Sequence, residues 1–162
     1  MTTPGQTVGP FFGMALPRDG GEHLVPPGTP GAVRLTGRVF DGDGAPVPDA
    51  LLEIGRTDSW GRAATDPEGR YAFTTLRPGP PARGLPFFAV TVFARGLLNR
   101  LFTRIYLPAP AEGLDADPLL GALDPERRTT LLARGDGDTL HFDVRLQGEG
   151  ETVFLTFPGH RA

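Results

Sequence analysis

The chain has 162 residues, enough for one domain with a substantial core, and its 39% hydrophobic and 22% charged residues are typical of a globular protein rather than a disordered one. A net charge of −3 gives no electrostatic basis for nucleic-acid binding, and the absence of cysteine excludes disulfides and thiolate ligands. We see no signal-peptide segment and no apolar run approaching about 18 residues, so we expect a cytoplasmic location and no membrane partner.

Residues 1–32 have no hydrophobic periodicity and are rich in Gly and Pro, which predicts an extended N-terminal arm. Within this arm Gly9 and Pro10 interrupt regular structure, because Pro lacks a backbone donor and restricts the residue before it. Phe11 and Phe12 follow at once. Such a stiff, apolar segment is expected to be buried, either against this chain or against another one.

Residues 33–162 are expected to form a single β-sandwich domain. Short runs rich in β-branched and aromatic residues alternate with turn residues, and the 23 Gly and 18 Pro residues of the chain suit such turns. The expected strands are Val33–Phe40, Ala50–Ile54, Arg70–Leu76, Phe87–Arg95, Leu101–Leu107, Thr139–Gln147 and Glu151–Phe157. About seven or eight short strands with almost no helix predict an all-β fold, an antiparallel β-sandwich.

The connections between these runs give weaker signals. Asp41–Gly44 has the alternating Asp residues of a calcium loop, but Ala45 and Val47 follow and the twelfth-position Glu is missing, so a turn is favoured. Pro108–Leu123 is predicted to be a loop. Pro125–Ala133 is predicted to hold one or two helical turns.

The strand Thr139–Gln147 alternates between apolar and polar residues. Leu140, Phe142, Val144 and Leu146 are expected to point inward, and His141, Asp143, Arg145 and Gln147 outward. His141 beside Asp143 is interpreted as a solvated or salt-bridged strand face rather than as a catalytic base. No His pair or phosphate loop accompanies them, so the residues alone predict neither a catalytic nor a metal-binding set.

Arg104 lies on the same strand face as Phe102 and Tyr106. Two interpretations of this cation between aromatic rings stay open. It can serve cation–π packing within the sheet, or it can bind an anion. Tyr106, like Tyr71, is expected to be a half-buried sheet residue rather than a metal ligand.

Two segments resemble a known family. Gln6–Pro10 (QTVGP) and Phe142–Phe157 (FDVRLQGEGETVFLTF) are similar to the α-type chains of the intradiol ring-cleaving dioxygenases, and shorter matches between them fall in the same order. The run Gln147–Phe154 (QGEGETVF) is long and unusual, which makes the resemblance specific. It implies a β-sandwich paired with a β subunit of similar fold, and an assembled enzyme that cleaves protocatechuate with O₂ to 3-carboxy-cis,cis-muconate.

The resemblance also implies a non-haem Fe³⁺ held in the β subunit by two Tyr and two His. In this chain Phe87 and Ala89 occupy the His positions, and Pro81 follows the Pro-Gly-Pro turn where a Tyr is expected. The insertion that carries the other Tyr is nearly absent around Gly55–Trp60. We therefore expect this chain alone to bind no iron and to hold no catalytic residue, with the Fe³⁺ bound by the partner β subunit.

The family further implies a contribution from the N-terminal arm, whose Thr-x-Gly-Pro segment lines the substrate pocket of the β subunit. The matching residues here are Thr7, Gly9 and Pro10. Arg104 matches an Arg of the family near that arm, and it is expected to hold Thr7 or to favour the substrate carboxylate.

A second resemblance leads to a different class of function. Leu35–Gly79 is similar to the transthyretin-like carboxypeptidase regulatory domains, which are β-sandwich binding modules without catalysis. This similarity covers only the middle of the chain. It explains neither Gln6–Phe12 nor Gln147–Phe154.

Overall fold

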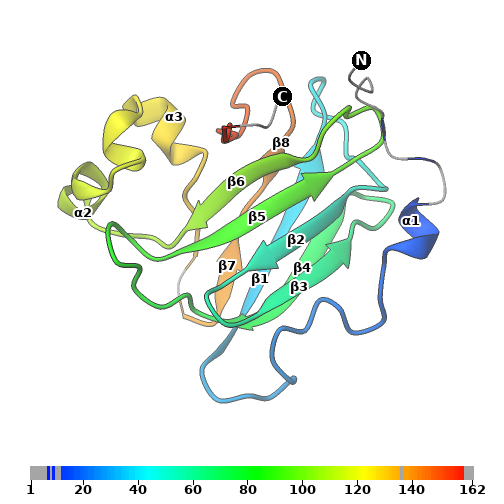
Figure 1. The fold of residues 1–162 in the computed structure, drawn as a ribbon, viewed down its shortest axis with the longest axis horizontal. Coiled ribbons are helices and arrows are strands. Elements are labelled where there is room, and N and C mark those ends of the chain that lie inside the picture. The colour runs from blue at the N-terminus through cyan, green and yellow to red at the C-terminus, as the bar shows by residue number, and fades with distance from the viewer. Residues whose placement is uncertain (1–6, 8, 10–11, 136, 159–162) are drawn as a thin grey trace.

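The computed structural model describes residues 7, 9, 12–135 and 137–158. Within these ranges two β-sheets pack face to face, and the short helices lie outside them (Figure 1). The predicted all-β sandwich is therefore confirmed.

The first sheet has the strand order β4-β1-β7, and β8 also pairs with β1. Its strands are β1 (Ala32–Phe40), β4 (Arg70–Leu76), β7 (Thr139–His141) and β8 (Val144–Arg145). β1 and β4 run antiparallel, whereas β7 and β8 run parallel to β1. The central strand is thus covered on both edges.

The second sheet has the strand order β3-β2-β5-β6, and each neighbouring pair is antiparallel. Its strands are β2 (Leu51–Gly55), β3 (Trp60–Ala64), β5 (Phe87–Phe93) and β6 (Leu101–Tyr106). β3 was not expected from the sequence. Its run Trp-Gly-Arg-Ala-Ala has little β-propensity, and pairing with β2 determines its conformation.

The core lies between the two sheets and follows the predicted alternation. Leu140, Phe142 and Val144 are buried from the first sheet, and Phe88 and Val90 face them from the second. Burial of each large apolar side chain stabilises the fold by about 1.5–3 kcal/mol.

Four short helices complete the described chain. They are α1 (Phe12–Ala15), α2 (Ala111–Ala116), the 3₁₀ helix η1 (Leu120–Ala122) and α3 (Pro125–Thr129). The loop predicted for Pro108–Leu123 was therefore wrong in part, because Leu114 and Leu120 pack in a second apolar cluster with Tyr106. The strand predicted for Glu151–Phe157 was also wrong. This segment forms no strand, and its β-pairing is limited to one isolated bridge between Leu155 and Phe102.

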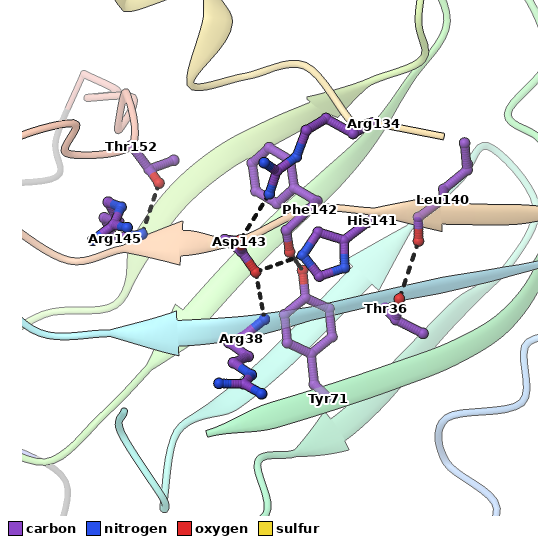
Figure 2. A network of polar contacts seen from close by, with 10 residues as sticks. All are labelled: Thr36, Arg38, Tyr71, Arg134, Leu140, His141, Phe142, Asp143, Arg145 and Thr152. Carbon is purple, nitrogen blue, oxygen red and sulfur yellow. Dashed lines mark hydrogen bonds and ion pairs between the residues drawn. The ribbon is translucent and has the colours of Figure 1, made fainter. Parts of the chain in front are cut away.

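The parallel ladder beside β1 is interrupted between β7 and β8, and side chains replace its missing bonds (Figure 2). The backbone N–H of Arg38 donates to Oδ1 of Asp143 (3.0 Å), and the Phe142 carbonyl accepts from the Tyr71 hydroxyl (2.6 Å). Burial, followed by the charge of Asp143, raises the pKa of Tyr71 and keeps this hydroxyl a donor. The Phe142 carbonyl points at Gly37, which leaves no room for a side chain there.

Candidate functional site

The outer face of the second sheet brings most of the predicted site positions together. Ala89 of β5 pairs with Arg104 of β6 on one side and with Gly55 of β2 on the other. Phe87 pairs with Tyr106. Residues that pair across antiparallel strands lie on the same face, so these five side-chain positions form one surface.

A cavity of about 170 Å³ opens on this face. Pro81, Phe87 and Ala89, the three positions at which the family resemblance places metal ligands, all line it. The other walls come from the end of β2, from the following residues Arg56 and Thr57, and from the loop at residues 78–79.

The side chains around this cavity do not fit ferric iron. Fe³⁺ requires imidazole or anionic oxygen ligands, whereas Pro81, Phe87 and Ala89 offer only carbon. The guanidinium of Arg56 also lines the cavity, where it is paired with Asp58 and offers no acceptor atom for a metal. Across the described ranges, no group of three or more His, Asp or Glu side chains could hold a metal ion.

Arg104 is held in place on this surface by two kinds of contact. Its guanidinium lies over the ring of Phe87, 4.0 Å from the ring centroid, and its Nη1 donates to the Tyr106 hydroxyl (2.9 Å). The cation–π partner is therefore Phe87 of the neighbouring strand. Because Ala89 has only a methyl group beside Arg104, the guanidinium is only partly covered.

Asp117 supports this arrangement from beneath. It is 3% exposed, and its carboxylate accepts hydrogen bonds from the backbone N–H groups of Leu85, Leu119 and Leu120 and from the Tyr106 hydroxyl. Burial alone would raise the pKa of Asp117, but these donors outweigh burial and hold the pKa below its ordinary value. Asp117 therefore stays ionised at neutral pH.

Tyr106 links Asp117 to Arg104. Its hydroxyl accepts from Arg104 and donates to Oδ1 of Asp117 (3.2 Å), and the residue is fully buried. Burial raises the pKa of Tyr106 even though the charge and hydrogen bond of Arg104 act in the opposite direction. Tyr106 and Tyr71 are both buried, so the expectation of half-buried positions was wrong for each.

Sequence reasoning missed Asp117, because it lies within the segment predicted to be a loop. A signal was present, since Asp followed by Pro118 and an apolar pair is typical of a residue that caps the start of a helical turn. The signal does not reveal that the same carboxylate also accepts hydrogen bonds from Leu85 and Tyr106, which lie 32 and 11 residues earlier in the sequence.

The described part of the N-terminal arm makes hydrogen bonds within this chain. The Thr7 hydroxyl accepts a hydrogen bond from the backbone N–H of Gly96 (2.9 Å), in the turn after β5. Gly96 has φ of +88°, a conformation that favours Gly. Gly9 is exposed, and its carbonyl accepts from the backbone N–H of the buried Phe12. Pro10 lies outside the described residues.

The pair His141 and Asp143 forms the salt-bridged strand face that the sequence suggested. His141 Nε2 lies 2.9 Å from Oδ1 of Asp143, and Arg134 Nη2 lies 2.9 Å from Oδ2 (Figure 2). This network bridges the break between β7 and β8, which assigns it a structural role.

The described residues contain no helix that is long and apolar enough to span a membrane.

Comparison with known proteins gives relatives that match almost the whole chain. The protocatechuate 3,4-dioxygenase alpha chain of Burkholderia cepacia is 38% identical over 94% of this chain and 96% of its own length, and that of Pseudomonas putida is 36% identical over 96% of both. The beta chain of the Burkholderia cepacia enzyme is 28% identical over 85% of this chain and 74% of its own length.

The fold and a shorter segment also match known proteins. The dioxygenase domain of a dioxygenase carbohydrate-binding protein fusion from Streptomyces sp. SirexAA-E superposes with a TM-score of 0.64 and 25% identity, over 78% of this chain and 87% of that one. The carboxypeptidase regulatory-like domain family matches residues 34–82.

Proposed function

The chain belongs to the family of protocatechuate 3,4-dioxygenase alpha chains, and on that premise we propose that it acts as the iron-free subunit of a heteromeric intradiol dioxygenase. A partner β subunit would hold the Fe³⁺. The assembled enzyme would cleave protocatechuate with O₂, giving 3-carboxy-cis,cis-muconate with both oxygen atoms incorporated.

The composition of the 170 Å³ cavity carries this proposal. The ligand positions of the family converge there, yet their side chains supply no donor atom for iron. A chain of this family that cannot hold the metal itself requires a partner that does. The similarity of this chain to a beta chain supports a partner of related fold.

The arm is the part of this chain that we propose to line the substrate pocket, through Thr7, Gly9 and Pro10. The Thr7 hydroxyl accepts from Gly96, which leaves its own hydrogen able to donate to a substrate oxygen. Gly9 has no atom within 4 Å of the position that a Cβ would take, so a ligand can approach its backbone closely. Arg104 would provide a fixed positive charge for the substrate carboxylate.

A binding module without catalysis is the weaker candidate. Its support is the match of the carboxypeptidase regulatory-like family to residues 34–82, whereas the alpha-chain relatives match 94–96% of the chain. Nothing in that shorter match accounts for the arm or for the C-terminal segment.

Expression of the chain with and without a family β subunit tests the proposal. We expect the purified lone chain to contain no stoichiometric iron and to consume no O₂ with protocatechuate, since its cavity lacks ligand atoms. The co-purified complex should contain ferric iron and turn protocatechuate over. Elemental analysis and an oxygen electrode provide the measurements. An iron-loaded, active lone chain would contradict the proposal.

A variant of Thr7 tests the role of the arm. In the complex, Thr7→Ala should lower kcat/KM for protocatechuate by roughly three- to tenfold, the effect of one lost hydrogen bond of about 1 kcal/mol. Thr7→Ser should restore most of the activity. The matched control is Thr29→Ala, which removes another exposed hydroxyl from the same arm. Equal kinetics of Thr7→Ala and Thr29→Ala would reduce Thr7 to a structural role.

A further inference from the structure

A second and larger cavity, of about 550 Å³, lies on the outer face of the first sheet, away from the candidate site. Its walls are β1 and β4, the edge strand β3, and the segment around Pro17 and Glu22. That segment crosses from one sheet to the other, since the Gly21 carbonyl accepts from Arg62 of β3 and Leu24 donates to Thr74 of β4. A cavity of this volume matches the usual size of small-molecule sites.

Arginine dominates the walls of this cavity. Five arginines line it, and they come from four separate parts of the chain: Arg18, Arg34, Arg38, Arg62 and Arg70. The carboxylates among its lining residues are Glu22 and Asp66, and His141 lies at the rim. This concentration of positive charge occurs in a protein whose net charge is −3. The arginines lining the cavity therefore outnumber its carboxylates, so its side chains carry an excess of positive charge.

Three of these arginines lack a carboxylate partner within the described ranges. Arg62 pairs with Glu53, Arg70 pairs with Asp66 and Glu68, and His141 pairs with Asp143. The guanidinium groups of Arg18, Arg34 and Arg38 have no such ion pair among the described residues. Arg38 binds Asp143 through its backbone N–H, and Figure 2 shows its guanidinium directed away from that carboxylate.

The sheet register places two of these arginines side by side, and only Arg70 has carboxylate partners among the described residues. Arg38 of β1 lies directly opposite Arg70 of β4, and such a pair has Cβ atoms about 5 Å apart. Like charges directly opposite one another destabilise a sheet. An anion bound between the two guanidinium groups would reverse this effect, because planar guanidinium groups bind carboxylates with paired hydrogen bonds.

The positive charge is divided between two ends of the cavity. Arg34 precedes Arg38 by four residues on the same strand, about 13 Å at the usual rise of a strand. Between them lie Thr36 and, opposite it on β4, Ala72. Ala63 and Ala64 of β3 add further apolar surface. The middle of the cavity is therefore lined by small, mostly apolar residues. Arginine side chains lie at each of its two ends.

From these observations we infer that the cavity binds a small organic anion that carries two carboxylates at opposite ends of an apolar body. The Arg38 and Arg70 pair holds one carboxylate, and Arg34 with Arg18 holds the other. An inorganic anion would satisfy one end only and would leave the apolar floor uncovered. The site shares no residue with the substrate pocket proposed above, which uses Thr7, Gly9, Pro10 and Arg104.

Isothermal titration of the full chain with three probes tests this inference. Terephthalate has two carboxylates across an apolar ring, benzoate has one carboxylate on the same ring, and inorganic phosphate has no apolar body. We expect saturable binding of terephthalate with one site per chain, at least tenfold tighter than either other probe. Absence of saturable binding, or equal binding of benzoate or phosphate, would overturn the inference.

Variants locate the binding. Arg38→Gln and, separately, Arg34→Gln should each weaken terephthalate binding at least tenfold. Arg95→Gln should change it less than twofold, because Arg95 is an exposed arginine outside the cavity that pairs with Asp49. Equal losses in all three variants would show a general charge effect and would reject the site.

The same variants separate binding from folding. Without ligand, Arg38→Gln should melt at the temperature of the wild type or above, because it removes the repulsion with Arg70. Terephthalate should raise the melting temperature of the wild type and of Arg95→Gln but not that of Arg38→Gln. A destabilised Arg38→Gln that still gains the full ligand shift would contradict the proposal.

Discussion

Replacing Gly37 by Ala should abolish the folded state or reduce its stability by more than about 4 kcal/mol, far beyond the usual effect of a Gly-to-Ala change. A Cβ at residue 37 would lie 1.6 Å from the carbonyl oxygen of Phe142 and 2.9 Å from the Tyr71 hydroxyl. Relief requires that the Phe142 carbonyl turn away, which breaks its hydrogen bond with Tyr71. Since both groups lie in the core, the loss leaves buried polar atoms unsatisfied.

Gly55 offers a matched control for this experiment. It also lies within a strand between two neighbours, but the closest atom to its added Cβ is the Ala89 carbonyl oxygen, 4.0 Å away. Gly55→Ala should therefore be neutral or stabilising by up to about 1 kcal/mol, because Gly loses more backbone entropy on folding. Urea unfolding followed by circular dichroism measures both variants, and an insoluble Gly37→Ala beside a soluble Gly55→Ala would agree with the prediction. Similar unfolding free energies would show that the ladder break can relax.

The ladder break also shows where sequence reasoning ends. The alternation of Leu140, Phe142 and Val144 correctly predicted a strand with one buried face, because side-chain direction follows local geometry. The alternation of buried and outward-facing side chains continues through the gap between β7 and β8. Phe142 stays buried there, although its carbonyl accepts from the Tyr71 hydroxyl rather than from a backbone N–H of β1. This arrangement depends on Gly37 and Tyr71, which are about 70 to 105 residues distant in the sequence. The alternation of apolar and polar residues along one strand therefore cannot predict contacts between residues so far apart in the sequence.

The candidate site divides in a similar way. Family resemblance alone singled out Pro81, Phe87 and Ala89. Their positions around one cavity depend on the pairing of β2 with β5 and on the loop that follows β4. Arg104 was identified on the correct face of its strand, because Phe102, Arg104 and Tyr106 alternate. Its stacking on Phe87 was not foreseen, since the register between β5 and β6 is set by tertiary packing. The roles of Thr7, Gly9, Pro10 and Arg104 in catalysis stay predictions.

The second large effect is expected at Asp117. Asp117→Asn should destabilise the chain by about 2–3 kcal/mol at neutral pH, because an amide replaces a buried carboxylate that accepts four hydrogen bonds. One oxygen of the carboxylate becomes an NH₂ group. Even with the amide oxygen in the place of Oδ1, this NH₂ group faces the backbone N–H of Leu85 and cannot accept from it. The control is Asp115→Asn in α2, which removes an exposed carboxylate paired with Arg128 and should cost less than about 1 kcal/mol.

The pH dependence of this loss follows from the direction of the pKa shift. The pKa of Asp117 is lower in the folded chain than its ordinary value of 3.8, so the folded state binds the proton more weakly than the unfolded state. The stabilisation by its carboxylate is therefore complete above about pH 5, diminishes below 3.8 and is lost as the pH falls through the folded pKa. The difference in unfolding free energy between wild type and Asp117→Asn should shrink over this acidic range. A difference that stays constant from pH 7 to pH 3 would contradict the assignment.

Asp117 should also affect the proposed substrate pocket, although it lies beneath the surface. Through the Tyr106 hydroxyl it fixes the acceptor to which Arg104 donates, so the amide variant weakens the support of that guanidinium. In the complex with a β subunit, Asp117→Asn should raise KM for protocatechuate more than it lowers kcat, because a misplaced Arg104 binds the carboxylate less well in the ground state. Arg104→Gln should raise KM similarly, and the double variant should add little, since both changes act through the same cation. Additive effects of the two changes would show that Asp117 supports only the fold and that Arg104 acts independently of it.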